Sequence, residues 1–145
     1  MSYLNDESLY REIIMDHVKN PRNQKDVTDK FKSIHLKNPS CGDELTLFIL
    51  IDKDQIVDLT YEVVGCSICT SSVSMMSELL IGKSISEAKK IIKNFNNMIT
   101  DKEYNPSLLG DAISLKGIVN VPPRIKCANL GYKAFSDFIE GETND

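Results

Sequence analysis

The spacing of apolar residues predicts the first element of the chain. Apolar side chains recur every four positions from Tyr10 to Val18, as they do on one face of an amphipathic helix. The polar residues 5–7 suit a helix start, because short caps and acidic side chains favour the positive end of the helix dipole. We place the end of this helix at Asn20-Pro21, since proline disfavours helical geometry in the residue before it.

An alternating pattern of apolar and polar residues then predicts three strands. The first strand contains Ile34 and Leu36. The apolar faces of the other two are Leu45, Leu47, Ile49 and Ile51, and Val57, Leu59, Tyr61 and Val63. The turn residues 52–54 join these two strands as a hairpin. Such short connections favour an antiparallel sheet with one apolar face.

The second half of the chain returns to helical spacing. One helix carries apolar residues from Ile68 to Leu80 and ends near Gly82. Ser84 and Glu87 are spaced as a capping box, which predicts the start of the next helix. A shorter helical segment is expected over 106–119. Pro122-Pro123 opens a last helix, with Leu130, Ala134 and Phe138 facing inward.

Three strands followed by several helices predict an α+β fold. We expect a three-stranded antiparallel sheet with helices packed on one face. The 145 residues fit one domain, so residues 1–145 are interpreted as a single unit.

Composition and charge exclude several classes of function. The net charge is -4 and no basic run stands out, which argues against a nucleic-acid partner. The longest apolar run, 45–51, is far too short to span a bilayer, so no membrane partner is expected. Residues 1–7 lack the basic start and apolar stretch of a secretory signal. We therefore expect a cytoplasmic protein.

The presence of four cysteines in a cytoplasmic protein needs an explanation. They are Cys41, Cys66, Cys69 and Cys127. A reducing cytosol disfavours structural disulfides. The remaining alternatives are buried apolar cysteines, metal ligands and reactive thiols.

The positions of three cysteines favour a metal site. Cys41 lies in a predicted loop, while Cys66 and Cys127 lie near the starts of two predicted helices. Zinc takes about four tetrahedral ligands, and Asp43, two residues after Cys41, could supply the fourth. Arg124, shortly before Cys127, could offset the negative charge of such a set.

Each of these residues also has a plainer interpretation. Cys127 shares a helical stripe with core residues, and Asp43 after a glycine suits a turn. Cys66 and Cys69 form a Cys-x-x-Cys pair, which is typical of redox chemistry or of half a zinc site, but no second pair follows. From these residues alone, metal binding and simple burial both stay open.

Other polar residues are interpreted without a chemical role. His17 lies beside Val18 and Lys19 in the first helix, and His35 alternates outward on a strand. The hydroxyl-rich run 70–74 lets its helix pack closely and has no base partner that the sequence identifies.

Four segments of the chain carry a resemblance to a known family. Residues 9–17, together with 20–23, resemble the opening of SufU proteins. Residues 38–43, 65–68 and 122–128 resemble the family's three cysteine motifs, in the same order. The similarity runs from about residue 9 to residue 138. The sequence thus resembles the SufU branch of the IscU and NifU-like iron–sulfur scaffold family, whose fold is of the SufE/NifU-like kind.

The resemblance implies a function and a set of site residues. One zinc per chain would be bound by Cys41, Asp43, Cys66 and Cys127, with Arg124 in a supporting role. Cys41 would accept persulfide sulfur from a SufS-type, PLP-dependent cysteine desulfurase. The sulfur would then pass to the SufBCD-type assembly machinery. The protein would act as a zinc-dependent sulfurtransferase in iron–sulfur cluster assembly.

Two further hypotheses remain. In an IscU-like scaffold, the same cysteines would hold a transient [2Fe-2S] cluster for transfer, although Lys126 stands where IscU-type proteins have a histidine ligand. In a structural zinc module, Cys69 would replace Asp43 in an all-cysteine site. Cys69 departs from the SufU pattern, and we assign it to the core.

Overall fold

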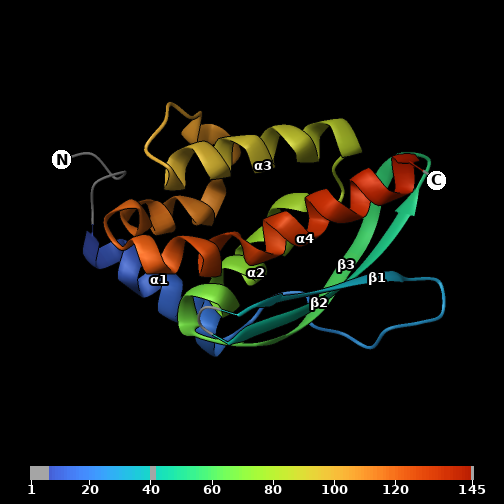
Figure 1. Cartoon of the computed structure of the whole chain (residues 1–145), viewed down its shortest axis with the longest axis horizontal. Coiled ribbons are helices and arrows are strands. Elements are labelled where there is room, and N and C mark those ends of the chain that lie inside the picture. Colours follow the sequence, from blue (N-terminus) through green and yellow to red (C-terminus); the bar gives the residue numbers. More distant parts are fainter. Residues whose placement is uncertain (1–6, 40–41, 145) are drawn as a thin grey trace.

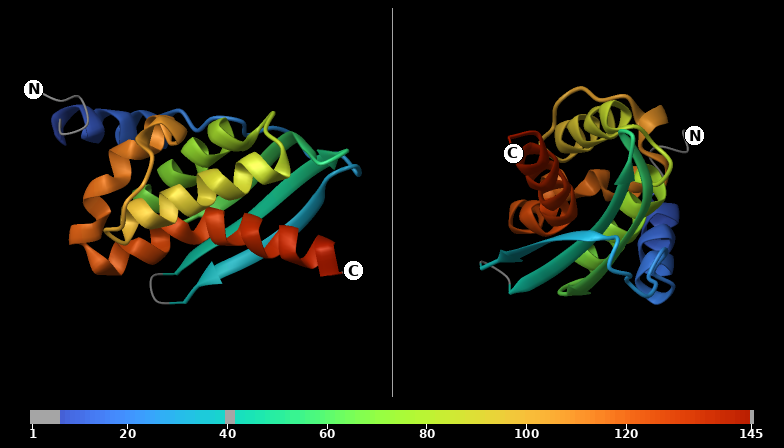
Figure 2. Two further views of the ribbon diagram at one scale, coloured as in Figure 1. Left: turned by 90° about the horizontal axis from the view of Figure 1, so that it is seen from above. Right: turned by 90° about the vertical axis from the view of Figure 1, so that its right-hand side faces the viewer.

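The computed structural model describes residues 7–39 and 42–144 of the chain. Three antiparallel strands form one sheet in the order β1-β2-β3. The strands are β1 (Lys32–Asn38), β2 (Asp43–Asp52) and β3 (Gln55–Val64). Helices cover one face of this sheet, and Figures 1 and 2 show the two layers. The predicted fold class is therefore confirmed.

The described helical elements follow the predicted order. The α-helices are α1 (Glu7–Lys19), α2 (Ser67–Leu80), α3 (Ile85–Ile99) and α4 (Ile125–Asn144). The 3-10 segments are η2 (Pro106–Leu108), η3 (Gly110–Asn120) and η4 (Pro122–Arg124). The segment expected over 106–119 is thus helical but of the tighter 3-10 type, and a short 3-10 turn precedes the last helix. The polar residues expected to start α1 lie mostly outside the described residues. No described helix is both long enough and apolar enough to cross a bilayer.

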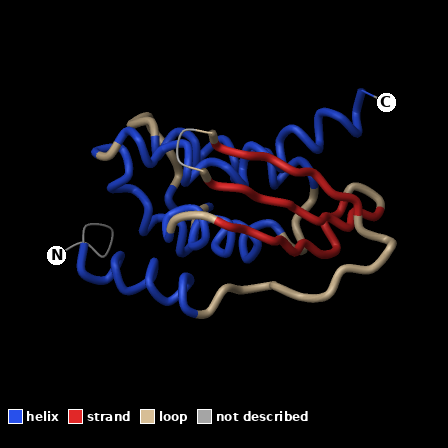
Figure 3. Tube along the Cα trace, turned by 60° about the horizontal axis from the view of Figure 1, so that its bottom comes forward, coloured by secondary structure: helices blue, strands red, loops and turns tan. Residues whose placement is uncertain are grey.

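The hairpin between β2 and β3 forms where the turn residues predict it. Lys53 and Asp54 both have positive φ, 51° and 63°, as the two central residues of a tight hairpin turn require. Leu45, Leu47 and Ile49 of β2 are at most 1% exposed, so their face of the sheet lies in the core. In Figure 3 the loop that follows α1 runs along the outside of the strands.

The predicted inner face of β3 is wrong at one position. Val57 is 49% exposed, whereas its neighbour Ile56 is fully buried. The pairing with β2 shifts between Leu50 and Ile51, which face Asp58 and Ile56 respectively. One extra residue on β3 therefore bulges out of the ladder, and the inside-outside alternation is reset at that point.

Helix α2 lies at the centre of the molecule. It packs against α1, α4, η3 and β3, while α4 covers β1 and β2 (Figure 1). The capping box that opens α3 is present: the Ser84 hydroxyl accepts from the Glu87 N–H, and the Glu87 carboxylate accepts from the Ser84 N–H. α2 ends before Gly82, whose φ of 86° favours glycine. This packing brings the N-terminal ends of α2 and α4 to the same end of the sheet as the start of β2.

Candidate metal centre

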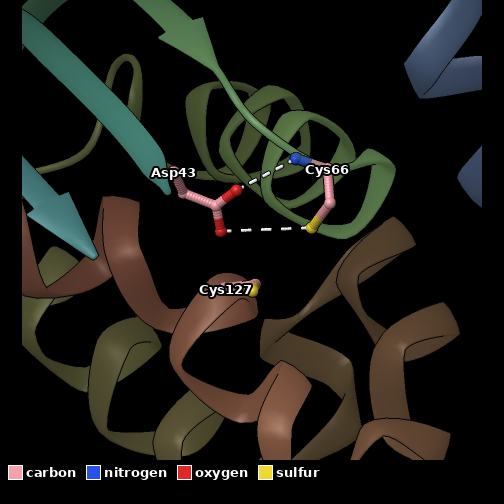
Figure 4. Close-up of side chains that lie close together, drawn as sticks. All are labelled: Asp43, Cys66 and Cys127. Carbon is pink, nitrogen blue, oxygen red and sulfur yellow. Dashed lines mark hydrogen bonds between the residues drawn. The ribbon is translucent and has the colours of Figure 1, made fainter. Parts of the chain in front are cut away.

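Three elements bring an aspartate and two cysteines together. Asp43 is the first residue of β2, and its side chain points inward and is 1% exposed. Cys66 is the N-cap of α2 and is half-buried. Cys127 lies in the first turn of α4 and is fully buried. Figure 4 shows the three side chains pointing toward one another.

The distances within this group suit a small metal ion. One donor atom from each of Asp43, Cys66 and Cys127 lies within 4.8 Å of the other two. The Cys66 Sγ is 4.0 Å from Asp43 Oδ2. Tetrahedral zinc with thiolate and carboxylate ligands needs donors about 3.5–3.8 Å apart, so a small contraction is enough. Two soft thiols and one carboxylate also form a donor set that zinc accepts.

Asp43 has a structural task in addition to its position in this group. Its Oδ1 accepts a hydrogen bond from the backbone N–H of Cys66 at 3.0 Å. The side chain of Cys66 makes no capping bond, so Asp43 supplies from β2 the acceptor that the start of α2 needs. The carboxylate thereby fixes the backbone of Cys66 with one oxygen and faces its sulfur with the other.

Gly65 makes this arrangement sterically possible. A Cβ atom at this position would lie 2.4 Å from Asp43 Oδ1 and 2.9 Å from its carboxyl carbon. Neither distance is compatible with a side chain, so glycine lets the end of β3 pass directly beside the carboxylate.

Positive and polar groups surround the thiols. Hydrogen bonding to Cys127 raises the pKa of Arg124, and the charge that Cys66 and Cys127 would carry as thiolates acts in the same direction. The Asn38 amide donates to Cys127 Sγ at 3.9 Å. Beside the group lies a pocket of about 260 Å³, lined by Lys37, Asn38, Pro39, Lys126, Asn129, Leu130 and Lys133. These cations offset the charge that deprotonated thiols would accumulate.

The predicted site residues can now be placed. Asp43, Cys66 and Cys127 come together, with Arg124 beside them. Cys41 lies outside the described residues. The strand pair Asn38 and Asp43 flanks its loop, and the Gly42 N–H donates to the Asn38 carbonyl at 2.9 Å.

Cys69 is not part of this group. Its side chain is 1% exposed and belongs to the hydrophobic core, as expected. Among the described residues, the donor cluster contains Asp43 and leaves Cys69 out.

A second polar cluster was missed by the sequence analysis. His17 is 1% exposed, with Nδ1 2.8 Å from Ser74 Oγ and Nε2 2.9 Å from Asp111 Oδ2. An ionised carboxylate only accepts, so Nε2 donates to Asp111 while Nδ1 bonds the Ser74 hydroxyl. Ser74 Oγ in turn accepts from the Arg22 N–H at 2.9 Å. The chain of hydrogen bonds ties α1, α2 and η3 together.

This Ser–His–Asp chain does not form a nucleophilic site. Ser74 is fully buried, so no substrate can reach its hydroxyl. The imidazole is also reversed: in serine hydrolases Nε2 faces the serine and Nδ1 the aspartate. From the sequence, His17 was interpreted as a residue without a chemical role, and its burial and its partners were not predicted. Its spacing of seven residues from the buried Tyr10 places both on one helix face and could have revealed its burial.

Comparison with known proteins gives three clear similarities. A family model described as the NifU-like N-terminal domain matches residues 9–128. The chain is 42% identical over 137 residues to the zinc-dependent sulfurtransferase SufU of Bacillus subtilis (strain 168), covering 94% of this chain and 92% of that protein. It is 37% identical over 138 residues to the iron–sulfur cluster assembly scaffold protein IscU of Streptococcus pyogenes serotype M1, covering 94% and 86%.

A solved structure is similar in both sequence and fold. The crystal structure of SufU from Fervidobacterium islandicum AW-1, described as a scaffold protein for the SUF system, superposes with a TM-score of 0.83. The two are 38% identical, and the similarity covers 91% of this chain and 97% of that chain.

Proposed function

Since this chain belongs to the NifU-like N-terminal domain family, we propose that it is a zinc-dependent sulfurtransferase for iron–sulfur cluster assembly. The observation that carries the proposal is the convergence of Asp43, Cys66 and Cys127 from three elements. The likeness to a SufU named as a zinc-dependent sulfurtransferase supports it. In this proposal the protein is cytoplasmic and works with a SufS-type, PLP-dependent cysteine desulfurase. Its site takes one zinc per chain.

The proposed zinc ligands are Cys41, Asp43, Cys66 and Cys127. Only Gly42 separates Cys41 from Asp43 in the sequence, which keeps their Cα atoms within about 7 Å of each other. Bound zinc would keep the thiols deprotonated near neutral pH and shield them from oxidation. Arg124 would hold the charge balance when one thiolate leaves the set.

The proposed transfer step takes place at Cys41. Its thiolate attacks the terminal sulfur of the desulfurase persulfide. A new S–S bond forms at Cys41, the S–S bond on the enzyme breaks, and the enzyme cysteine leaves as a thiolate. Cys66, Cys127 and Asp43 stay behind on α2, α4 and β2, while the loop position predicted for Cys41 from the sequence suits the one ligand that must reach a partner. The sulfur would then pass to SufBCD-type machinery.

The surface around the group suits a docking partner. Val64 directly precedes Gly65-Cys66 and is 74% exposed, and Val121 precedes η4 and is 45% exposed. Exposed apolar side chains beside cationic ones, such as Arg124, are typical of the centre and rim of protein interfaces. We therefore propose that the desulfurase docks over this end of the molecule.

Desulfurase stimulation and zinc content test the proposal together. The wild-type protein should contain about one zinc per chain and strongly accelerate a SufS-type enzyme. Cys41→Ala should fold normally and abolish the stimulation, because the sulfur acceptor is gone. Cys69→Ala is the matched control and should keep both zinc and stimulation under anaerobic conditions. Stimulation by the Cys41→Ala protein would show that another residue is the acceptor.

The likeness to a scaffold protein named IscU supports a second candidate function. Here the same thiolates would hold a transient [2Fe-2S] cluster, for which soft sulfur ligands are suited. Anaerobic reconstitution with iron and sulfide separates the two functions. A stable cluster that transfers to an apo-protein would favour the scaffold, whereas loss of iron on gel filtration would favour sulfur transfer.

A structural zinc module with an all-cysteine site remains the third candidate. It requires Cys69 as a ligand and predicts that Cys69→Ser loses zinc while Asp43→Ala keeps it. The sulfurtransferase proposal predicts the reverse. The burial of Cys69 in the core and the position of Asp43 in the donor cluster support the reverse outcome.

A further inference from the structure

Cys66 and Cys69 occupy two related positions at the start of α2. Cys66 is the N-cap, with an extended backbone (φ -72°, ψ 168°) and a half-buried side chain that caps nothing. Cys69 is the third residue of the helix and is 1% exposed. The proposed zinc site uses Cys66 and leaves Cys69 without a function.

Side chains at these two positions can reach each other. In α3 of this same protein, Ser84 and Glu87 hold the equivalent positions, and each side chain bonds the other's backbone N–H at 3.1 Å. In α2 the N–H of Cys66 is bound by Asp43 instead, so the two cysteine side chains are not needed as caps for each other.

The separation is small enough for a covalent bond. Helical residues three apart have Cβ atoms about 5–6 Å apart, and a disulfide needs about 3.5–4.5 Å. Cys66 lies outside the helical hydrogen-bonding pattern, apart from its carbonyl, which accepts from the Thr70 N–H at 3.0 Å. A rotation of its side chain and a modest backbone shift therefore close the gap.

We propose that Cys66 and Cys69 form a redox-active pair that a peroxide converts to an intramolecular disulfide. The Cys66 sulfur attacks the peroxide, the O–O bond breaks, and a sulfenic acid forms with release of hydroxide. The Cys69 sulfur then attacks Cys66, the S–S bond forms, and the S–O bond breaks. In sum, two thiols and one hydrogen peroxide give one disulfide and two waters. A small thiol reverses the change by supplying two electrons.

The assignment of roles follows from exposure. Of the three cysteines that the structure describes, Cys66 is the one that an oxidant in solution can reach, and Cys69 is the buried neighbour that resolves the product. The disulfide removes Cys66 from the group with Asp43 and Cys127, so metal binding and disulfide formation exclude each other at this sulfur.

Cys127 is the rival partner, because its Sγ also lies within 4.8 Å of Cys66 Sγ. It belongs to α4, however, whereas Cys69 is held beside Cys66 by a single turn of the same helix. Bonding to Cys127 requires α4 to move against α2, whereas bonding to Cys69 requires only a local adjustment within the first turn of α2. Cys69 should therefore capture the oxidised Cys66 first.

Trypsin distinguishes the products directly. Cleavage after lysine yields peptide 54–83, which contains both Cys66 and Cys69, and separate peptides 38–53 and 127–133, which contain Cys41 and Cys127. Zinc-depleted protein is treated with hydrogen peroxide, alkylated, digested and weighed by mass spectrometry. We expect peptide 54–83 to appear unalkylated, two hydrogen masses lighter and unlinked to any other peptide. Dithiothreitol should restore its two thiols.

Variants and zinc provide the controls. Cys69→Ala should give no such peptide, and its Cys66 should proceed to irreversible sulfinic acid. Cys69→Ser serves as a second variant if alanine perturbs the core, and thermal unfolding shows whether each is folded. Zinc-loaded wild-type protein should oxidise more slowly than zinc-depleted protein, because the metal occupies Cys66.

Three outcomes would overturn the proposal: a main product linking peptide 54–83 to 127–133 or to 38–53, sulfinic acid without a disulfide in the wild type, or the same internal disulfide mass in Cys69→Ala. No desulfurase enters this test. Its failure would therefore leave the sulfur-transfer proposal standing, and a failure of desulfurase stimulation would leave the disulfide measurable.

Discussion

Replacing Gly65 with alanine probes the contact on which the proposed metal centre is built. The new Cβ would lie 2.4 Å from Asp43 Oδ1, whereas ordinary contacts begin at 3.4 Å. The carboxylate must therefore retreat by about 1 Å, which lengthens its 3.0 Å bond to the Cys66 N–H beyond the hydrogen-bond range. Losing a bond to a charged acceptor costs about 1.5–3 kcal/mol. Reduced entropy of the unfolded chain returns about 0.4–1 kcal/mol.

The net expectation for Gly65→Ala is a loss of about 1.5 kcal/mol in the metal-free protein, or roughly 3–6 °C in Tm. Zinc affinity should fall about 10–100-fold, as it does when groups that orient metal ligands are disturbed. Calorimetry measures the first effect, and competition with a chromophoric zinc chelator measures the second. Gly117→Ala is the matched control, because nothing lies within 4 Å of its added Cβ.

Asp43→Asn separates the two tasks of the carboxylate. The amide oxygen can still accept from the Cys66 N–H, so the metal-free variant should be about as stable as the wild type. Zinc affinity should nevertheless fall, since a neutral amide is a poorer ligand. If Gly65→Ala behaved like Gly117→Ala in both assays, the contact between Gly65 and Asp43 would not control the site, and the reasoning would be refuted.

Three further predictions concern the rest of the fold. Tyr132→Phe should raise stability by about 1–2 kcal/mol in thermal unfolding, because the buried hydroxyl has no hydrogen-bond partner among the described residues; a lower Tm would contradict this. His17→Ala should cost about 2–4 kcal/mol without changing zinc affinity, since it opens a cavity between helices and removes the imidazole that bonds the buried Ser74 and links it to Asp111; equal stability of variant and wild type would count against it. Hydrogen bonds from Ser84 lower the pKa of Glu87 below its usual 4.5 in the folded protein. The stability that Glu87 contributes is therefore fully present above its pKa in the unfolded chain, and it is lost as pH falls through its pKa in the folded protein. The Tm difference between wild type and Glu87→Gln should therefore shrink as pH is lowered from above the unfolded pKa of Glu87 to below its folded pKa. A difference that stays constant over these pH values would contradict the prediction.

Local rules were sufficient for the elements themselves. The turn at Lys53 and Asp54, and the capping box of Ser84 and Glu87, depend on residues at most three apart, so the sequence predicts them directly. The period of the apolar residues likewise predicts which face of each helix is buried. Val57 escaped prediction because a bulge depends on the pairing of two strands, and the pairing resets the alternation.

The candidate site was predictable in its membership but not in its geometry. The sequence places cysteines at the starts of α2 and α4, and the spacing of Asp43 suggests a further ligand. Periodicity cannot show that Asp43 caps a helix 23 residues away, nor that His17 of α1 bonds Ser74 of α2. Such contacts join elements that only tertiary packing brings together.

The same division explains Cys66 and Cys69. The Cys-x-x-Cys spacing in the sequence determined that the two residues lie one turn apart. It left both redox chemistry and metal binding open. Only the tertiary structure decided that the N-cap residue faces the gap between β2 and α4 while the third helical residue faces the core. The physical reason is that the spacing places the two residues side by side on α2, whereas the surroundings of each are set by elements remote in sequence.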